Sequence, residues 1–162
     1  MIAVHFKPQS DFADKTQVAF EKEKGELLKI LPQADIQHIG STAIPNAMTK
    51  GDLDLQVRVE KDDFQEAVEK LKKLFEINQP DNWTENYASF KDDKRDIGVQ
   101  LTVKGSYDDR QFQGQQQLLS NNPKVLEQYN KMKLSFEGKD IKDYRAARAK
   151  FFEELKNEGL LH

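Results

Sequence analysis

Two strictly alternating segments constrain the fold of this chain more than any other feature. Residues 52–59 place Leu53, Leu55, Val57 and Val59 between Asp52, Asp54, Gln56 and Arg58. Residues 96–103 place Ile97, Val99, Leu101 and Val103 between Asp96, Gly98, Gln100 and Thr102. Successive side chains of a β-strand point to opposite faces of its sheet. We therefore expect two strands that each have one apolar face and one polar face.

Helical patterns surround these strands. Apolar residues recur at helical spacing from Asp11 until Pro32, and again over residues 61–75. Shorter strands are expected at residues 2–6, 36–39 and 87–90, and helical segments at 111–117, 123–136 and 140–155. Strands up to residue 103 followed by helices predict one α/β domain over residues 1–162. Its mixed sheet would be backed by helices, with a helical C-terminal part.

Composition excludes several kinds of protein. The 162 residues include 25 Lys+Arg and 28 Asp+Glu, for a formal net charge of −3. This balance argues against nucleic acid as a partner, although a local basic face stays open. The absence of cysteine excludes a thiolate metal site and a cysteine nucleophile. No apolar run approaches the roughly 18 residues of a membrane span, and no signal peptide is evident, so we expect a cytoplasmic protein without a membrane partner.

The chemistry-bearing residues lie in the loop after the 36–39 strand and at the start of the 52–59 strand. A Gly40-Ser41 turn after a strand offers backbone amides and a hydroxyl to a polyphosphate. Asp52 and Asp54 share a strand face with Cα atoms about 6.6 Å apart, so both can bind one Mg²⁺ or a pair of ions. The alternative is an ordinary turn and two solvated aspartates in an acid-rich chain. Pro45 rules out a Walker A phosphate loop.

The run from His38 to Pro45, His-Ile-Gly-Ser-Thr-Ala-Ile-Pro, followed by Thr49-Lys50 and Asp54, closely resembles the GrpB-like family. Weaker similarity extends over most of the chain and includes Gly105-Ser106, Pro123, Tyr129 with Lys133, and residues 144–151. Members of that family occur alone or fused to dephospho-CoA kinase, and the family belongs to the nucleotidyltransferase fold superfamily. The resemblance therefore implies a nucleotidyltransferase-like fold.

The resemblance also implies roles for individual residues. Gly40 and Ser41, joined by Thr42 and Lys50, would bind nucleotide phosphates, while Asp52 and Asp54 would bind Mg²⁺ and act in catalysis. The expected reaction transfers a nucleotidyl group from a nucleoside triphosphate to an unknown small-molecule acceptor. The alternative is a catalytically reduced module of the same fold that binds a nucleotide or a CoA-type ligand.

The match is incomplete at the third carboxylate of the superfamily pattern. Relatives often carry a His-x-His pair where this chain has Gln100 and Thr102, and an Arg-Asp pair where it has Gln116-Gln117. Amides and hydroxyls form hydrogen bonds but do not replace ionisable groups in proton transfer or metal binding. Asp96 shares the strand face with Gln100 but lies about 13 Å further along. Catalysis is therefore less firmly predicted than nucleotide binding.

Four further residues are candidates with two interpretations each. His38 would either order the loop or touch phosphate, and Lys50 would either offset phosphate charge or lie solvated. Arg145 and Arg148 share helical spacing with Lys142, so they could bind a phosphate-rich ligand. Alternating charge on a solvated helix would produce the same pattern.

Overall fold

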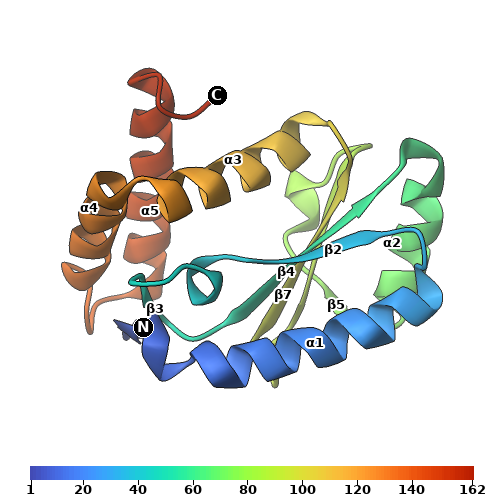
Figure 1. The fold of residues 1–162 in the computed structure, drawn as a ribbon, viewed down its shortest axis with the longest axis horizontal. Helices are drawn as coiled ribbons and strands as arrows, with labels where there is room; N and C mark the ends of the chain where they lie inside the picture. The colour runs from blue at the N-terminus through green and yellow to red at the C-terminus, as the bar shows by residue number, and fades with distance from the viewer.

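A five-stranded mixed sheet forms the centre of the protein in the computed structural model, which describes residues 1–162 (Figure 1). Across the sheet, the strands follow the order β2 (Asp35–Ile39), β4 (Leu53–Val59), β7 (Ile97–Val103), β6 (Tyr87–Asp92) and β5 (Glu76–Ile77). β4 and β7 are parallel, whereas the other neighbours are antiparallel. This arrangement confirms the predicted mixed α/β fold, with β4 and β7 as its two central alternating strands.

The apolar faces of β4 and β7 pack against α1 (Ala13–Ile30) and α2 (Phe64–Lys72). Leu55 and Leu101 from the sheet and Leu71 from α2 are fully buried in this core. Both helices were predicted, and a short 3-10 turn at Lys61–Asp63 precedes α2. The apolar residues that alternate along the strands therefore pack against the apolar faces of α1 and α2 in one layer.

The polar face of the sheet is covered by α3 (Tyr107–Asn121) rather than by solvent. Asp109 of α3 accepts hydrogen bonds from Arg58 Nε at 2.7 Å and from Gln56 Nε2 at 3.0 Å. Thr102 also donates to this carboxylate, at 3.0 Å, and both Gln56 and Thr102 are fully buried. Because these buried polar groups form hydrogen bonds with one another, α3 can cover a sheet face that the sequence pattern predicts to be exposed to solvent.

The C-terminal helices form a second apolar core at one end of the sheet (Figure 1). It joins α3, α4 (Pro123–Leu134) and α5 (Ile141–Asn157) to the loop between β2 and β4, through Ile44 and Ala47. The helical C-terminal part is thus confirmed. None of the helices is long and apolar enough to cross a membrane.

Three short strands differ from the sequence prediction. The expected strand at residues 2–6 is wrong, since the pairing lies at β1 (Lys7–Pro8), which is antiparallel to β3 (Met48–Thr49). Within residues 2–6, Ala3 forms an isolated bridge to Asp140. β3 and β5 were not predicted, because a two-residue strand has no periodicity to detect and depends on its partner.

Candidate functional site

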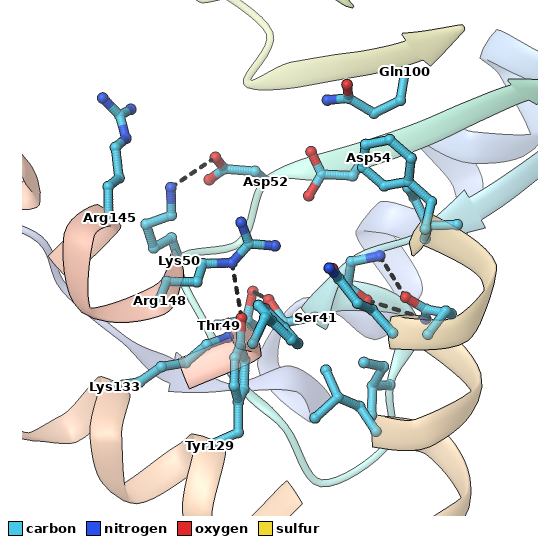
Figure 2. A pocket seen from close by; sticks show the side chains of 18 of the residues that line it. Ser41, Thr49, Lys50, Asp52, Asp54, Gln100, Tyr129, Lys133, Arg145 and Arg148 are labelled. Carbon is cyan, nitrogen blue, oxygen red and sulfur yellow. Dashed lines mark hydrogen bonds and ion pairs between the residues drawn. The ribbon is translucent and has the colours of Figure 1, made fainter. Parts of the chain in front are cut away.

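A cleft of about 220 Å³ lies where the sheet meets the loop after β2 and the C-terminal helices (Figure 2). Asp52, Asp54 and Gln100 reach it from the sheet side, and Gly40 and Ser41 from the loop. The helices contribute aromatic, amide and cationic side chains: Phe112, Gln115, Gln116, Tyr129, Lys133, Tyr144, Arg145, Arg148 and Phe152. The structure therefore brings the Gly-Ser turn and the two aspartates to one concavity.

Two glycines make room for the Asp54 carboxylate. In the sheet, Asp54 lies between Ile39 of β2 and Gly98 of β7. A Cβ atom at Gly98 would lie 2.8 Å from Asp54 Oδ1, and one at Gly40 would lie 2.5 Å from Asp54 Oδ2. Both distances are too short for a side chain, so glycine at both positions keeps the carboxylate beside the cleft. The sequence could not reveal the role of Gly98, because it depends on the register between β4 and β7.

The Asp54 carboxylate has no hydrogen bond or ion pair within the chain, although it is partly buried. Burial and the neighbouring charge of Asp52 raise the pKa of Asp54 to about 6, against the opposing effect of Arg148, Lys50 and Lys133. A carboxylate in this position gains free energy from a cation that replaces its lost hydration. Asp54 is therefore suited to hold a metal ion.

Asp52 lies at the more exposed edge of the cleft, with 41% of its side chain accessible and Oδ2 at 3.3 Å from Lys50 Nζ. No third carboxylate or histidine joins the two aspartates to form a closed metal site. Asp96 is exposed in the turn before β7 and does not line the cleft. Two carboxylates fit Mg²⁺ provided that waters and phosphate oxygens supply its remaining ligands, as is usual for this ion.

The loop after β2 is held by side chains from several elements. Gln116 of α3 accepts from the Gly40 amide at 2.8 Å, so this N–H already has a partner. Ser41 lines the cleft, and its hydroxyl donates to Thr49 at 2.8 Å. The backbone amide of Ser41 has no partner within the chain. The amide of Ser41 is thus the available donor of this turn, because the Gly40 amide and the Ser41 hydroxyl already donate within the chain.

Thr42 and His38 lie beneath the loop. Thr42 is 2% exposed and donates from Oγ1 to the Asp52 carbonyl at 2.9 Å, so its side chain does not line the cleft. His38 Nε2 lies 2.9 Å from the same hydroxyl. Because the hydroxyl hydrogen is used, His38 must donate from Nε2, and burial lowers the pKa of this imidazole. The loop-ordering interpretation of His38 fits this geometry, and Thr42 has a structural position in place of the expected phosphate contact.

Four cationic side chains line the cleft: Lys50, Lys133, Arg145 and Arg148. Figure 2 shows Arg148 extending between the aspartates and Tyr129, whose hydroxyl accepts from Arg148 Nε at 3.0 Å. Arg145 has no ion pair or hydrogen bond within the chain, and Lys142 does not line the cleft. The helical spacing of the two arginines therefore places both at the cleft, against two carboxylates, in a chain of net negative charge.

Lys133 was not among the predicted site residues, although it lines the cleft. It is 1% exposed, donates to the Met48 carbonyl at 2.7 Å and lies 4.3 Å from the centre of the Tyr129 ring. Burial lowers the pKa of Lys133 to about 8. Its position follows from α4 packing on β3, a long-range contact, and the one sequence signal was that Tyr129 and Lys133 belong to the resemblance to the GrpB-like family.

The two polar residues of β7 that were predicted at the site lie in different surroundings. Gln100 lines the cleft, whereas Thr102, two residues further along the strand, is fully buried beneath α3. Thr102 belongs to the hydrogen-bonded network around Asp109 and does not reach the site. Eight of the predicted site residues thus line the same cleft, namely Gly40, Ser41, Lys50, Asp52, Asp54, Gln100, Arg145 and Arg148.

Comparison with known proteins identifies the family of this chain. The family model for GrpB protein matches residues 10–158, nearly the whole chain. The chain belongs to the GrpB family. A UPF0157 protein of Vibrio cholerae serotype O1 is 29% identical to this GrpB protein over 154 residues, which cover 94% of this chain and 81% of the relative.

A crystal structure supports the same fold for this GrpB protein. The conserved protein GrpB from Enterococcus faecalis superimposes with a TM-score of 0.73. The similarity covers 90% of this chain and 92% of the other at 21% sequence identity. At that identity the comparison establishes the fold, and the chemistry has to be argued from the cleft itself.

Proposed function

We propose that this GrpB protein binds a magnesium-bound nucleoside triphosphate in the cleft and transfers its nucleotidyl group to an acceptor. The observation that carries the proposal is the joint placement of Asp52 and Asp54 with Ser41 and four cationic side chains. Carboxylates suit Mg²⁺, while lysine and arginine suit the phosphate oxygens that Mg²⁺ leaves free. Both kinds of group are needed for a polyphosphate and occur here at one place.

Each group would have a distinct task in binding. Asp52 and Asp54 would hold Mg²⁺, which neutralises phosphate charge when bound. Lys50 and Arg148 extend toward the aspartates and would bind phosphate oxygens, and the Ser41 backbone amide would donate to another. In transfer, an acceptor oxygen bonds to the α-phosphorus while the bond to pyrophosphate breaks. Positioning and charge neutralisation supply most of the catalysis in such reactions.

The test of transfer is Mg²⁺-dependent release of pyrophosphate from a nucleoside triphosphate, in the presence of a mixture of small hydroxyl and phosphate acceptors. We expect release with the native protein and at least a hundredfold less with Asp54→Asn. Asp62→Asn, which alters an exposed aspartate outside the cleft, is the matched control and should release pyrophosphate normally. Equal release by the native and Asp54→Asn proteins would refute the proposal.

A second candidate is a binding module of the same fold without turnover. Two observations favour it, namely the absence of a third carboxylate in the cleft and the engagement of the Gly40 amide by Gln116. A nucleotide or a CoA-type ligand would then act as a signal for a partner protein. Saturable ligand binding without pyrophosphate release from any mixture would favour this function over transfer.

A further inference from the structure

The side chain of Gln100 is held in a fixed orientation at the sheet end of the cleft. Its Oε1 accepts from the Tyr87 hydroxyl at 2.7 Å, across the β6–β7 pair. Burial raises the pKa of Tyr87, so this hydroxyl keeps its hydrogen at neutral pH. The Gln100 Nε2 group makes no hydrogen bond within the chain and is therefore free to donate to a ligand.

The surroundings of Gln100 differ from those at the other end of the cleft. Figure 2 shows Gln100 on the Asp54 side, well separated from Lys133, Tyr129 and Arg145. Phe112 of α3 also lines the cleft, with its ring centre 5.9 Å from that of Tyr87. Gln115 lines the same cleft and has no hydrogen-bond partner. An aromatic ring beside free amides suits a planar, uncharged group that accepts hydrogen bonds.

The cleft therefore has an order along its length. Gln100 lies at one end, the carboxylates of Asp54 and Asp52 follow, and Lys50, Arg145 and Arg148 lie beyond them (Figure 2). A nucleotide has the same order, with a flat base at one end, phosphates at the other, and the metal bound at the phosphates. This correspondence places the base near Phe112 and the phosphates near Arg148.

We propose that Gln100 determines base specificity by donating from Nε2 to a carbonyl oxygen of the nucleotide base, with Tyr87 as its positioning residue. The inference rests on the proposed function and specifies which nucleotide bases its ligand carries. Guanine and uracil present a carbonyl oxygen where adenine and cytosine present an amino group. A fixed amide donor attracts the carbonyl and leaves the amino group without an acceptor.

The experiment measures dissociation constants, with Mg²⁺ present, for the four ribonucleoside triphosphates and for inorganic tripolyphosphate. The native protein should bind GTP and UTP about tenfold more tightly than ATP and CTP. Gln100→Glu still accepts from Tyr87 but presents an oxygen to the base, so it should reverse this preference. Tyr87→Phe removes one hydroxyl and frees the amide to rotate, so it should reduce the preference to about twofold or less.

Tripolyphosphate separates this inference from the proposed function, because it has phosphates and no base. Its affinity should be unchanged in Tyr87→Phe, and in each variant it also reports whether the phosphate site is intact. Equal affinity for all four nucleotides in the native protein would overturn the role of Gln100, as would an unchanged preference in Gln100→Glu. If neither tripolyphosphate nor any nucleotide bound, the proposed function itself would fail.

Discussion

At the residue scale, the burial of the Asp54 carboxylate suits it to bind a cation and is expected to reduce the free energy of unfolding. Its carboxylate is partly buried beside Asp52, has no bonding partner in the chain, and has a pKa raised to about 6. Residues arranged for binding commonly reduce stability in this way when the ligand is absent. The free energy of unfolding and the affinity for Mg²⁺ should therefore respond oppositely to a change at this position.

We expect Asp54→Asn to stabilise the ligand-free protein by about 1–2 kcal/mol at neutral pH, since the amide carries no charge to bury. The same variant should lose Mg²⁺ binding. Denaturant unfolding and calorimetric titration with Mg²⁺ and tripolyphosphate measure the two effects. Asp52→Asn, at a more exposed site, should weaken Mg²⁺ binding with little gain in stability. A loss of stability in Asp54→Asn would contradict the account.

The pH dependence of stability follows from the same group. Because the pKa of Asp54 is about 6 in the folded protein, above its ordinary value of 3.8, folding favours the protonated form. The stabilisation is complete below about pH 4 and is lost as pH rises through 6. Other groups titrate in this range, so the quantity to measure is the difference in unfolding free energy between native protein and Asp54→Asn. The advantage of the variant should grow from pH 4 to pH 7, and a constant difference would refute the assignment.

At the scale of elements, a buried carboxylate of α3 binds the sheet, beside the hydrogen bonds that Gln113 donates to Gln37 and Gln56. Asp109 is 2% exposed and accepts from Arg58, Gln56, Thr102 and the Gly105 amide. Since α3 also supplies Phe112 and Gln116 to the cleft, this attachment fixes one wall of the site.

Asp109→Ala should therefore destabilise the protein by about 3–5 kcal/mol, because Gln56, Thr102 and the Gly105 amide lose this acceptor and Arg58 keeps only its ion pair with Asp35. Denaturant unfolding measures the loss. Asp108→Ala, which changes the adjacent residue in the same first turn, should cost less than about 1 kcal/mol. Similar losses in the two variants would show that the buried network does not secure α3.

Gln116 connects α3 to the Gly40-Ser41 loop, and its removal separates two effects. Gln116→Ala should lower stability by about 1 kcal/mol, since the Gly40 amide loses its partner. The freed amide can then donate to phosphate, so the affinity for tripolyphosphate should rise. Gln117→Ala, exposed on the same helix, is the control in thermal unfolding and titration. Weaker tripolyphosphate binding in Gln116→Ala would mean that the bond to Gly40 shapes the site instead of blocking it.

Strands and helices whose apolar residues recur with a regular period were predictable from the sequence. Short strands that form only by pairing with a neighbouring strand were not. The alternation around Leu55 and Leu101 identified β4 and β7, because burial on one face imposes a period of two. β3 and β5 have no such period and exist through pairing. The sequence pattern of β4 also predicts that its polar face is exposed to solvent. The neighbouring residues do not indicate that Asp109, which is distant in sequence, covers Gln56.

At the scale of the whole molecule, the cleft lies between two apolar cores, one under the sheet and one among the C-terminal helices. The sequence predicted that Asp52, Asp54 and Ser41 lie together, and all three line the cleft, because each follows from strand alternation or a turn next to a strand. It did not single out Lys133, which comes from α4, or the room provided by Gly98, which depends on strand register. Thr42 was expected at the phosphates and is buried beneath the loop, because a turn sequence does not fix which side chains point inward.

The central claim is that Asp52 and Asp54 bind the metal of a metal–nucleotide complex. A crystal grown with Mn²⁺ and a non-hydrolysable nucleoside triphosphate, measured for anomalous scattering from Mn²⁺, tests it most directly. The account predicts an anomalous peak about 2.1 Å from a carboxylate oxygen of each aspartate, with phosphate oxygens completing the coordination. A nucleotide bound in the cleft without metal at these carboxylates, or Mn²⁺ bound only elsewhere, would contradict it.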